Sequence, residues 1–369
     1  MALSGASAPL REPQSKARAR KAGAAVPLDA ADKLLLNLLQ SRFPLDPEPY
    51  VGIARQAELP LDEVQARTQR LLDERIIREI TPIFDTRALG YASMLVAAKV
   101  DTANPQRAAR IINSHPGVSH NYLRTHEFNL WFTIATPPDS TLGLEGTLEV
   151  LKAQTGAESI RQLPTLTLFK INMNLEMEQG TEALAAAVDA APPRELVAQP
   201  YDERDVAVIR ALQGPMTVSD RPYDRAAEQV GMGTEGLLEH LREMVERKLL
   251  RRVAAILYHR RAGFSANGMG VWRVSSDQVL EVGSSMAAVR GISHCYQRPT
   301  YPDWPYSLFT MAHGRSKPEC DAILDRIAEE HGLHGDDRAV LYSSTEFKKV
   351  RLHYFVDDYA TWEREHAGA

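Results

Sequence analysis

The chain has few cysteines and no long apolar run. Its 369 residues include two cysteines, Cys295 and Cys320, which fit neither a disulfide framework nor a Cys-x-x-Cys metal site, so we expect ordinary thiols. No apolar stretch reaches the roughly 18 residues that a membrane-spanning helix requires, and the first residues lack the apolar core of a signal peptide. The net charge of −5 gives no general attraction to a polyanion. These absences predict a soluble, cytoplasmic protein without a membrane partner.

Signatures of nucleotide binding, metal binding and serine hydrolysis are also missing. The sequence contains no Gly-rich phosphate loop, no His-Glu-x-x-His and no Gly-x-Ser-x-Gly elbow. If the chain is an enzyme, we therefore expect it to work without a tightly bound organic cofactor and without a metal site of its own.

One motif occurs twice. Residues 117–126 read Gly-Val-Ser-His-Asn-Tyr-Leu-Arg-Thr-His and lead into an apolar run at 130–135. Residues 291–298 read Gly-Ile-Ser-His-Cys-Tyr-Gln-Arg and, after an aromatic insertion at 301–306, lead into a second apolar run. A repeated Gly-x-Ser-His-x-Tyr-x-Arg indicates two copies of one unit.

The first copy combines two patterns. A helix is predicted to begin near residue 28, with Asp29 as N-cap, and two more at 49–57 and 62–74, followed by a two-stranded wing to about residue 86. A β-α-β-β-α-β pattern follows, with strands at 92–100, 118–125, 130–135 and 165–172 and helices at 105–114 and 144–155. These patterns predict a winged helix-turn-helix and then a ferredoxin-like sandwich.

The second copy repeats this order. Residues 49–78 align with 222–251 without a gap, and Phe169-Lys170 matches Phe347-Lys348. The fold class is α+β, a tandem duplication of a winged helix-turn-helix followed by a ferredoxin-like, AsnC-type sandwich. The predicted segments are a disordered basic tail at 1–27, winged helix 1 at 28–88, sandwich 1 at 89–179, a linker at 180–200, winged helix 2 at 201–261, sandwich 2 at 262–356 and a C-terminal tail at 357–369.

The predicted recognition helices are a poor match for DNA. Acidic residues balance or outnumber basic ones on both: Asp62, Glu63, Asp73 and Glu74 against Arg67, Arg70 and Arg75 in the first, and Glu235, Glu239, Glu243 and Glu246 against Arg242, Arg247 and Lys248 in the second. Phosphate contacts require net positive charge, so we do not expect DNA binding.

The repeated motif carries the candidate chemistry. Alternation along a strand places His120, Tyr122 and Arg124 on one face, and His126 joins them if the strand continues. His294, Tyr296 and Arg298 alternate in the same way. Arginine offers a fixed fork for a carboxylate, and histidine changes charge near neutral pH. The set could therefore bind a carboxylated ligand and move protons, or it could line a wet domain interface.

The aromatic insertion of the second copy is the other candidate. Tyr301 and Trp304 lie in Tyr-Pro-Asp-Trp-Pro-Tyr, which could form a rigid wall for a flat ligand or a stiff hairpin tip. His313, at the end of the next predicted strand, is a weaker candidate.

In architecture the chain resembles the Lrp/AsnC family of transcription regulators. More specifically, residues 117–133 and 301–314 resemble the two halves of a siroheme decarboxylase, and nearly all of the chain except the tail and linker takes part in the resemblance. In many members of that family the halves are separate subunits, whereas here they look fused. The resemblance implies an internal pseudo-heterodimer, with a homodimer as a further possibility.

The resemblance also implies the reaction. Siroheme would lose the carboxyl groups of its C12 and C18 acetate side chains to give 12,18-didecarboxysiroheme, in haem d1 or alternative haem biosynthesis. His120 and His126 would supply the proton donor and a group facing the iron or a carboxylate, although the sequence does not tell which is which. Arg124 and Arg298 would hold carboxylates. The residues that would line or support the macrocycle are Tyr122, Trp131, His294, Tyr296, Tyr301 and Trp304.

The two halves are not equivalent, and other functions remain open. At the position of His126 the second half has Tyr301, so we expect the first half to carry more of the chemistry. The alternatives are a ligand- or haem-responsive Lrp/AsnC-type transcription regulator and a haem-binding sensor or carrier.

Overall fold

A computed structural model describes residues 27–171, 197–258, 266–314 and 316–366. The expected basic tail lies outside these residues apart from residue 27, and the expected linker lies outside them apart from 197–200.

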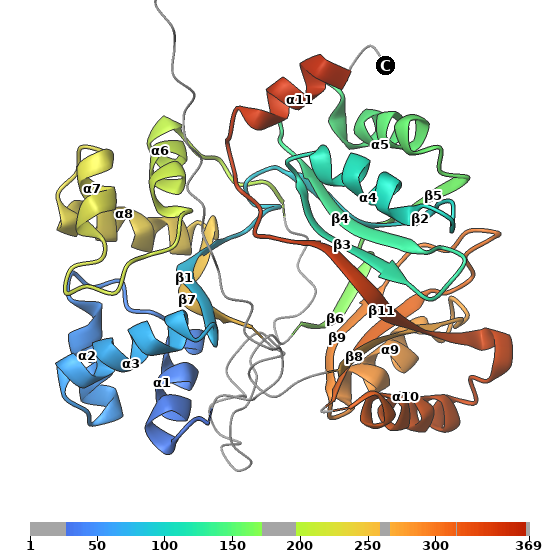
Figure 1. Cartoon of the computed structure of the whole chain (residues 1–369), viewed down its shortest axis with the longest axis horizontal. Helices are drawn as coiled ribbons and strands as arrows, with labels where there is room; N and C mark the ends of the chain where they lie inside the picture. The colour runs from blue at the N-terminus through green and yellow to red at the C-terminus, as the bar shows by residue number, and fades with distance from the viewer. Residues whose placement is uncertain (1–26, 172–196, 259–265, 315, 367–369) are drawn as a thin grey trace, which may run out of the picture.

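The two winged-helix units form one module, on the left of Figure 1. The helices of the first unit are α1 (Ala30–Ser41), α2 (Pro49–Ala57) and α3 (Leu61–Asp73), and those of the second are α6 (Glu203–Leu212), α7 (Asp224–Gln229) and α8 (Thr234–Glu246). Asp29 caps α1 as predicted and forms a capping box with Asp32. Tyr50 and Tyr223, which occupy equivalent positions in the two repeats, are both buried against Phe43. The two winged-helix units therefore share one hydrophobic core.

The predicted wings do not form as hairpins in the described residues. Instead, each unit supplies one long strand, β1 (Ile77–Phe84) and β7 (Leu250–Leu257), and the two strands pair with each other in an antiparallel sheet. Thr81 pairs with Ala254, the residue aligned with it in the repeat, so the pseudo-twofold axis passes through this pair. The prediction was wrong because a strand from the other copy satisfies the same backbone groups as a local hairpin would.

A nine-stranded sheet forms the second module. Its strands from the first half are β2 (Ala92–Lys99), β3 (Val118–Arg124), β4 (Leu130–Thr136), β5 (Ser159–Leu163) and β6 (Thr167–Ile171). Those from the second half are β8 (Ala266–Trp272), β9 (Ile292–Gln297), β10 (Leu308–Gly314) and β11 (Arg338–Lys349). The strand order is β5-β2-β4-β3-β11-β8-β10-β9-β6.

The two halves exchange strands within this sheet. We expected residues 165–172 to complete the first sandwich, but β5 takes that edge position beside β2, and β6 pairs with β9 of the second half. Conversely, β11 pairs first with β8 of its own half and then, from Ser343 onward, with β3 of the first half. The predicted repeat is confirmed, whereas the assignment of this strand to the first half was wrong.

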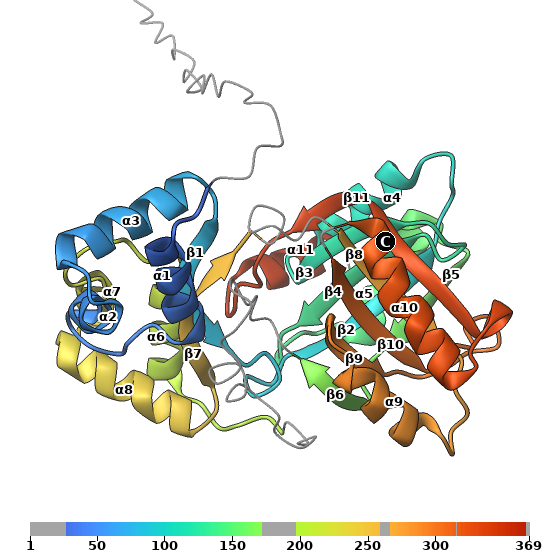
Figure 2. The same cartoon turned by 90° about the horizontal axis from the view of Figure 1, so that it is seen from below.

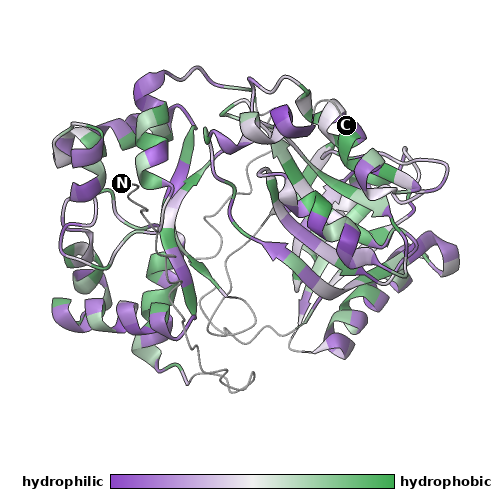
Figure 3. Ribbon diagram, turned by 45° about the horizontal axis from the view of Figure 1, so that its top comes forward, coloured by the Kyte–Doolittle hydropathy of each residue, from purple (hydrophilic) through white to green (hydrophobic). Residues whose placement is uncertain are grey.

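The helices cover the outer faces of the sheet module. Helices α4 (Pro105–Ser114) and α5 (Gly143–Thr155) lie on the first half, and α9 (Val279–Ala288) and α10 (Lys317–His331) lie on the second (Figure 1). A further apolar core includes Ala97 and Trp131 from the first half together with Val271, Phe309 and Leu341 from the second. The two halves of the sheet therefore pack against each other through the faces that the helices do not cover. Figure 2 shows β1 and β7 on the side of the winged-helix module that faces this sheet, and Figure 3 shows green, hydrophobic residues along many of the strands.

The C-terminal segment is not a simple tail. We expected residues 357–369 to form one, but Asp358–His366 form α11, which lies across the first half (Figure 1). Trp362 joins the core beneath α4 and α5, and Glu363 accepts hydrogen bonds from Ser140 and Thr141. Helix α11, which follows the second half in the sequence, thus packs on the first half.

Over the described ranges, no helix is long and apolar enough to cross a membrane.

Candidate active site

Strand β3 presents its polar residues to two different sides. Asn121 is buried and donates to the side-chain oxygen of Asn113 in α4 at 2.9 Å, so it faces the helix layer. His120 and Tyr122 lie on the other side, with ring centroids 6.2 Å apart, and the guanidinium of Arg124 lies 5.8 Å from the Tyr122 ring. The predicted alternation is confirmed.

His120 is the centre of a group that we name the first polar cluster: His120, Tyr122, Lys349 and Arg78. Lys349, the last residue of β11, pairs with His120 across the strands. Directly paired residues project to the same face of a sheet, so the lysine and the imidazole share a face. Burial, assisted by the positive charges of Lys349 and Arg78, lowers the pKa of His120 to about 4. The imidazole is therefore neutral at pH 7 in the free protein.

The hydroxyl of Ser119 orients this imidazole. Ser119 Oγ lies 3.0 Å from His120 Nδ1 and 2.7 Å from Thr133 Oγ1. With Nδ1 engaged by the serine, Nε2 is the nitrogen that can meet a ligand.

The repeat produces a related group, the second polar cluster: His294, Tyr296, Arg87 and Arg251. Ser293 Oγ lies 2.6 Å from His294 Nδ1, and the rings of His294 and Tyr296 are 5.9 Å apart. Burial raises the pKa of Tyr296 to about 12, although the positive charges of Arg298, Arg251 and Arg87 oppose the shift. Tyr296 thus remains a neutral phenol at pH 7.

Arg124 and Arg298 tie the halves together crosswise. Arg124 Nη1 donates to the carbonyl oxygen of Leu341 in the second half at 2.7 Å, and Arg298 Nη1 donates to that of Leu163 in the first half. Burial lowers the pKa of both guanidiniums to about 10, so they stay charged at neutral pH. Within the described part of the chain, neither Nε has a hydrogen-bond partner. One Nη1–H group of each guanidinium is therefore hydrogen-bonded to a backbone carbonyl of the other half.

His126 lies apart from His120. It follows β3, and even Arg124 is four residues beyond His120, a separation of roughly 13 Å at about 3.3 Å per residue. The His126 ring packs edge-on against Trp304 of the second half with centroids 5.3 Å apart, and its Nδ1 accepts the Phe128 N–H at 3.0 Å. Burial lowers its pKa, with a small opposing effect from Glu127. The structure does not bring the two candidate histidines of the first half together.

The aromatic insertion closes this end of the interface. Trp304 is fully buried and contacts Trp131, also buried, at 5.2 Å between ring centroids. Tyr301 donates its hydroxyl to the carbonyl of Gln162 at 2.6 Å, and Arg161 holds Asp303 through two contacts of 2.7 Å. Trp131 and Trp304 therefore support the interface from within.

His313 belongs near the first polar cluster, although it comes from the second half. Burial lowers its pKa, and the charge of Lys349 lowers it further, so the same lysine acts on two histidines from different halves. Sequence reasoning missed Lys349 and Arg78. One signal was available: extending the match of Phe169-Lys170 to Phe347-Lys348 by one residue places Lys349 opposite Ile171.

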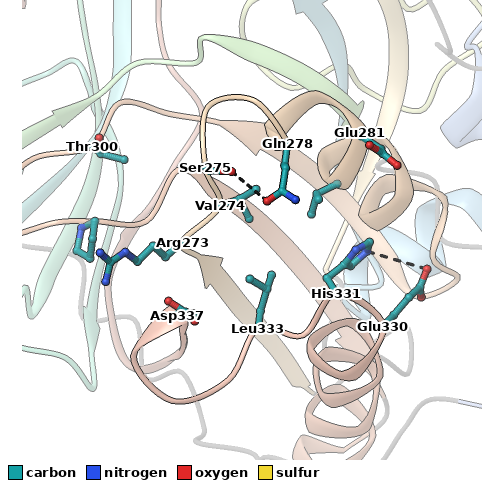
Figure 4. Close-up of a pocket in the computed structure, with 12 residues that line it drawn as sticks. Arg273, Val274, Ser275, Gln278, Glu281, Thr300, Glu330, His331, Leu333 and Asp337 are labelled. Carbon is teal, nitrogen blue, oxygen red and sulfur yellow. Dashed lines mark hydrogen bonds and ion pairs between the residues drawn. The ribbon is translucent and has the colours of Figure 1, made fainter.

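A separate pocket lies in the second half. Its volume is about 860 Å³, and it is bordered by α9, the end of α10 and the segment before β11 (Figure 4). Its charged lining combines Arg273 with Glu281, Glu330 and Asp337, a poor match for a ligand with many carboxylates. It includes none of the predicted site residues. In the described ranges, no group of three or more His, Cys, Asp or Glu side chains could hold a metal ion.

Comparison with known proteins decides the family. Residues 32–78 and 205–251 match the family described as "Siroheme decarboxylase NirDL-like HTH domain", and residues 88–170 and 261–348 match "AsnC-like ligand binding domain". A siroheme decarboxylase of Hydrogenobacter thermophilus is 37% identical over 331 residues, which cover 90% of this chain and 97% of that protein. The chain belongs to the siroheme decarboxylase family.

Other members support the fused arrangement. A siroheme decarboxylase beta subunit of Oleidesulfovibrio alaskensis is 41% identical over 160 residues, covering 43% of this chain and all of the subunit. The crystal structure of the siroheme decarboxylase NirDL in complex with an iron-uroporphyrin III analogue matches with a TM-score of 0.72 and 32% identity, covering 92% of this chain and 99% of that one. A single subunit thus corresponds to less than half of the chain, which is an internal pseudo-dimer.

Proposed function

We propose that this chain is a carboxy-lyase that removes the carboxyl groups of the C12 and C18 acetate side chains of siroheme, giving 12,18-didecarboxysiroheme. Family membership supports the substrate. The observation that carries the proposal is the first polar cluster, where a neutral imidazole lies beside cations from two other elements. An octacarboxylate macrocycle needs such cations, and its decarboxylation needs a proton donor.

Each decarboxylation has a simple balance. The bond between the acetate methylene and its carboxylate breaks, carbon dioxide leaves, and the electron pair passes into the conjugated ring system. The methylene carbon then gains a proton and becomes a methyl group. No external oxidant or reductant is required. Since the macrocycle accepts the electron pair, we propose that the protein uses no organic cofactor, and the iron enters with the substrate.

We propose His120 as the proton donor. On its own it is neutral at pH 7, because its pKa is about 4. Substrate carboxylates beside Lys349 and Arg78 would offset the positive charges that disfavour protonation, so substrate binding would load the imidazole with the proton that the reaction consumes. Ser119 keeps Nδ1 engaged and leaves Nε2 to deliver it.

His126 and the arginines receive supporting roles in this proposal. Because His126 packs on Trp304, it would hold the insertion in place or supply a second polar contact at that end of the interface. Arg124 and Arg298 would keep the two halves in register through their bonds to Leu341 and Leu163. We further propose a cytoplasmic enzyme that acts as this internal pseudo-dimer, with haem d1 or haem as the end product of its pathway.

Alanine variants of single histidines test these assignments. Purified wild type, His120→Ala and His126→Ala are incubated anaerobically with siroheme, with His334→Ala, an exposed histidine outside both clusters, as control. General acid catalysis contributes typically 10²- to 10⁴-fold, so we expect His120→Ala to lose roughly that much turnover while retaining tetrapyrrole binding. Turnover at the wild-type rate in His120→Ala would overturn its assignment, and an equally large loss in His126→Ala would make that residue a donor as well.

A further inference from the structure

The first polar cluster draws its cations from two distant parts of the chain. Lys349 ends β11 and is exposed, so a ligand can reach it. Arg78 belongs to β1, the strand of the winged-helix unit, and this strand lies against the end of β11, because Arg351, two residues beyond Lys349, donates to Thr81 and to the carbonyl of Pro82 in β1. The winged-helix module therefore borders the first polar cluster.

Positive charge exceeds negative charge around Arg78. Glu79 is the acidic neighbour, and it lies 3.6 Å from Arg78 Nε and 3.9 Å from Arg351 Nε. Arg351 also donates to Thr81 and to the carbonyl of Pro82 in β1. One carboxylate thus faces two guanidiniums. On β11, Lys349 adds a third cation opposite His120 and Glu346 adds a second carboxylate opposite Tyr122, so three positive charges stand against two negative ones.

The second polar cluster is built differently. At the position of Lys349 it has Ile171, which pairs with His294 in the strand register. Arg251, aligned with Arg78 in the repeat, makes a 2.8 Å ion pair with Asp85, a residue aligned with Tyr258. The second cluster therefore has no cation on the strand position that pairs with its histidine, whereas the first cluster has Lys349 there.

The chemistry of decarboxylation limits what these cations can usefully hold. Negative charge leaves the reacting carboxylate in the transition state, so a cation bound to that carboxylate would stabilise the ground state more than the transition state. A cation can instead bind a carboxylate that stays on the ring. Such a cation does not stabilise the ground state relative to the transition state, and it positions the reacting group. On each pyrrole-derived ring of a uroporphyrin-type macrocycle, a propionate stands next to the acetate.

We propose that Lys349 and Arg78 bind the propionate on the same ring as the departing acetate, and so place the acetate methylene at His120. This inference rests on the proposed function and names the substrate group that the cluster recognises. It makes β1 a substrate-binding element in place of a DNA-binding wing.

Two tetrapyrroles separate propionate recognition from acetate recognition. Iron uroporphyrin III carries acetates and propionates, whereas in iron coproporphyrin III methyl groups replace the acetates. Binding of each is followed by absorbance titration for wild type, Lys349→Met and Arg78→Met, with Lys152→Met, an exposed lysine on α5, as control. Loss of one hydrogen bond to a charged group corresponds to roughly a 10- to 100-fold weaker Kd. We expect that loss for both tetrapyrroles in both variants, wild-type affinity in Lys152→Met and partial recovery in Lys349→Arg.

Other outcomes would overturn the inference. A loss confined to iron uroporphyrin would assign the cations to the acetate, and unchanged Kd values in folded variants would remove them from the site. Circular dichroism checks folding, and Lys349→Gln serves if Lys349→Met does not fold. Siroheme turnover by wild type is measured in parallel: its absence alongside a Lys349-dependent Kd would refute the proposed function while leaving the binding site in place.

Discussion

Substrate binding should be coupled to proton uptake at His120. In the free protein its pKa is about 4, so at pH 7 only about one molecule in a thousand is protonated there. A carboxylate placed about 4 Å from the imidazole, at an effective dielectric constant of about 20, stabilises the charged form by about 4 kcal/mol. That energy corresponds to roughly a thousandfold change in the protonation equilibrium, which would bring the pKa in the complex to about 7.

The number of protons taken up follows from these two values. Binding of the tetrapyrrole should draw in about half a proton at pH 7 and about nine-tenths of a proton at pH 6. Calorimetric titration with iron uroporphyrin III in two buffers of different ionisation enthalpy measures this number directly. Titration of His120→Gln isolates the contribution of the imidazole, because the remaining ionisable groups are unchanged.

If wild type and His120→Gln take up the same number of protons at pH 6 and at pH 7, no carboxylate of the ligand lies near His120, and the proton-donor assignment loses its electrostatic basis.

Further predictions concern α11, acid stability and DNA. Trp362 is buried and donates its indole N–H to Ser114 Oγ at 3.1 Å, so Trp362→Ala should lower the free energy of unfolding by about 3–5 kcal/mol in urea titrations, and Trp362→Phe by less. Burial, together with the charge of Lys348, lowers the pKa of His115 from 6.5 to about 3. As the pH falls, the imidazole of His115 is protonated in the unfolded chain before it is protonated in the folded protein. The free energy of unfolding should therefore fall by roughly 4 kcal/mol between pH 6.5 and pH 3, and His115→Gln should weaken this pH dependence. On the first recognition helix Arg67 and Arg70 pair with Asp32, and on the second Arg247 pairs with Asp205, so heparin at moderate salt should not retain the protein; retention would revive the regulator hypothesis.

Much of the fold was predictable because local signals were strong. The boundaries of α2 and α4 agree with the prediction, since Pro49 and Pro105 each mark a first helical turn. The repeated Gly-x-Ser-His motif announced the duplication, and alternation placed His120 and Tyr122 on one face of β3.

The pairing between halves was not predictable in the same way. A strand pattern such as that of β6 states which residues can form a strand but not which neighbour satisfies its backbone groups. In a duplicated chain each neighbour exists twice, and β1, β6 and the end of β11 all pair with the other copy. For this reason the wings and the edge of the first sandwich were wrong in the prediction.

The same cause limited the prediction of the site. Lys349 and Arg78 lie far from the motif in sequence and meet His120 only through β11 and β1. Residue type suggested that Arg124 binds a carboxylate, but one of its N–H groups donates to the Leu341 carbonyl. Residue type in a motif suggested the chemistry, whereas the exchange of strands decided which residues stand beside the histidine.

Mass spectrometry of the tetrapyrrole extracted after anaerobic incubation of the purified chain with siroheme shows directly whether the chain decarboxylates siroheme. We expect a product lighter by two carbon dioxide units, formed through a singly decarboxylated species. Siroheme recovered unchanged but tightly bound would contradict this expectation and indicate a carrier or sensor, and siroheme that does not bind would contradict the site as well.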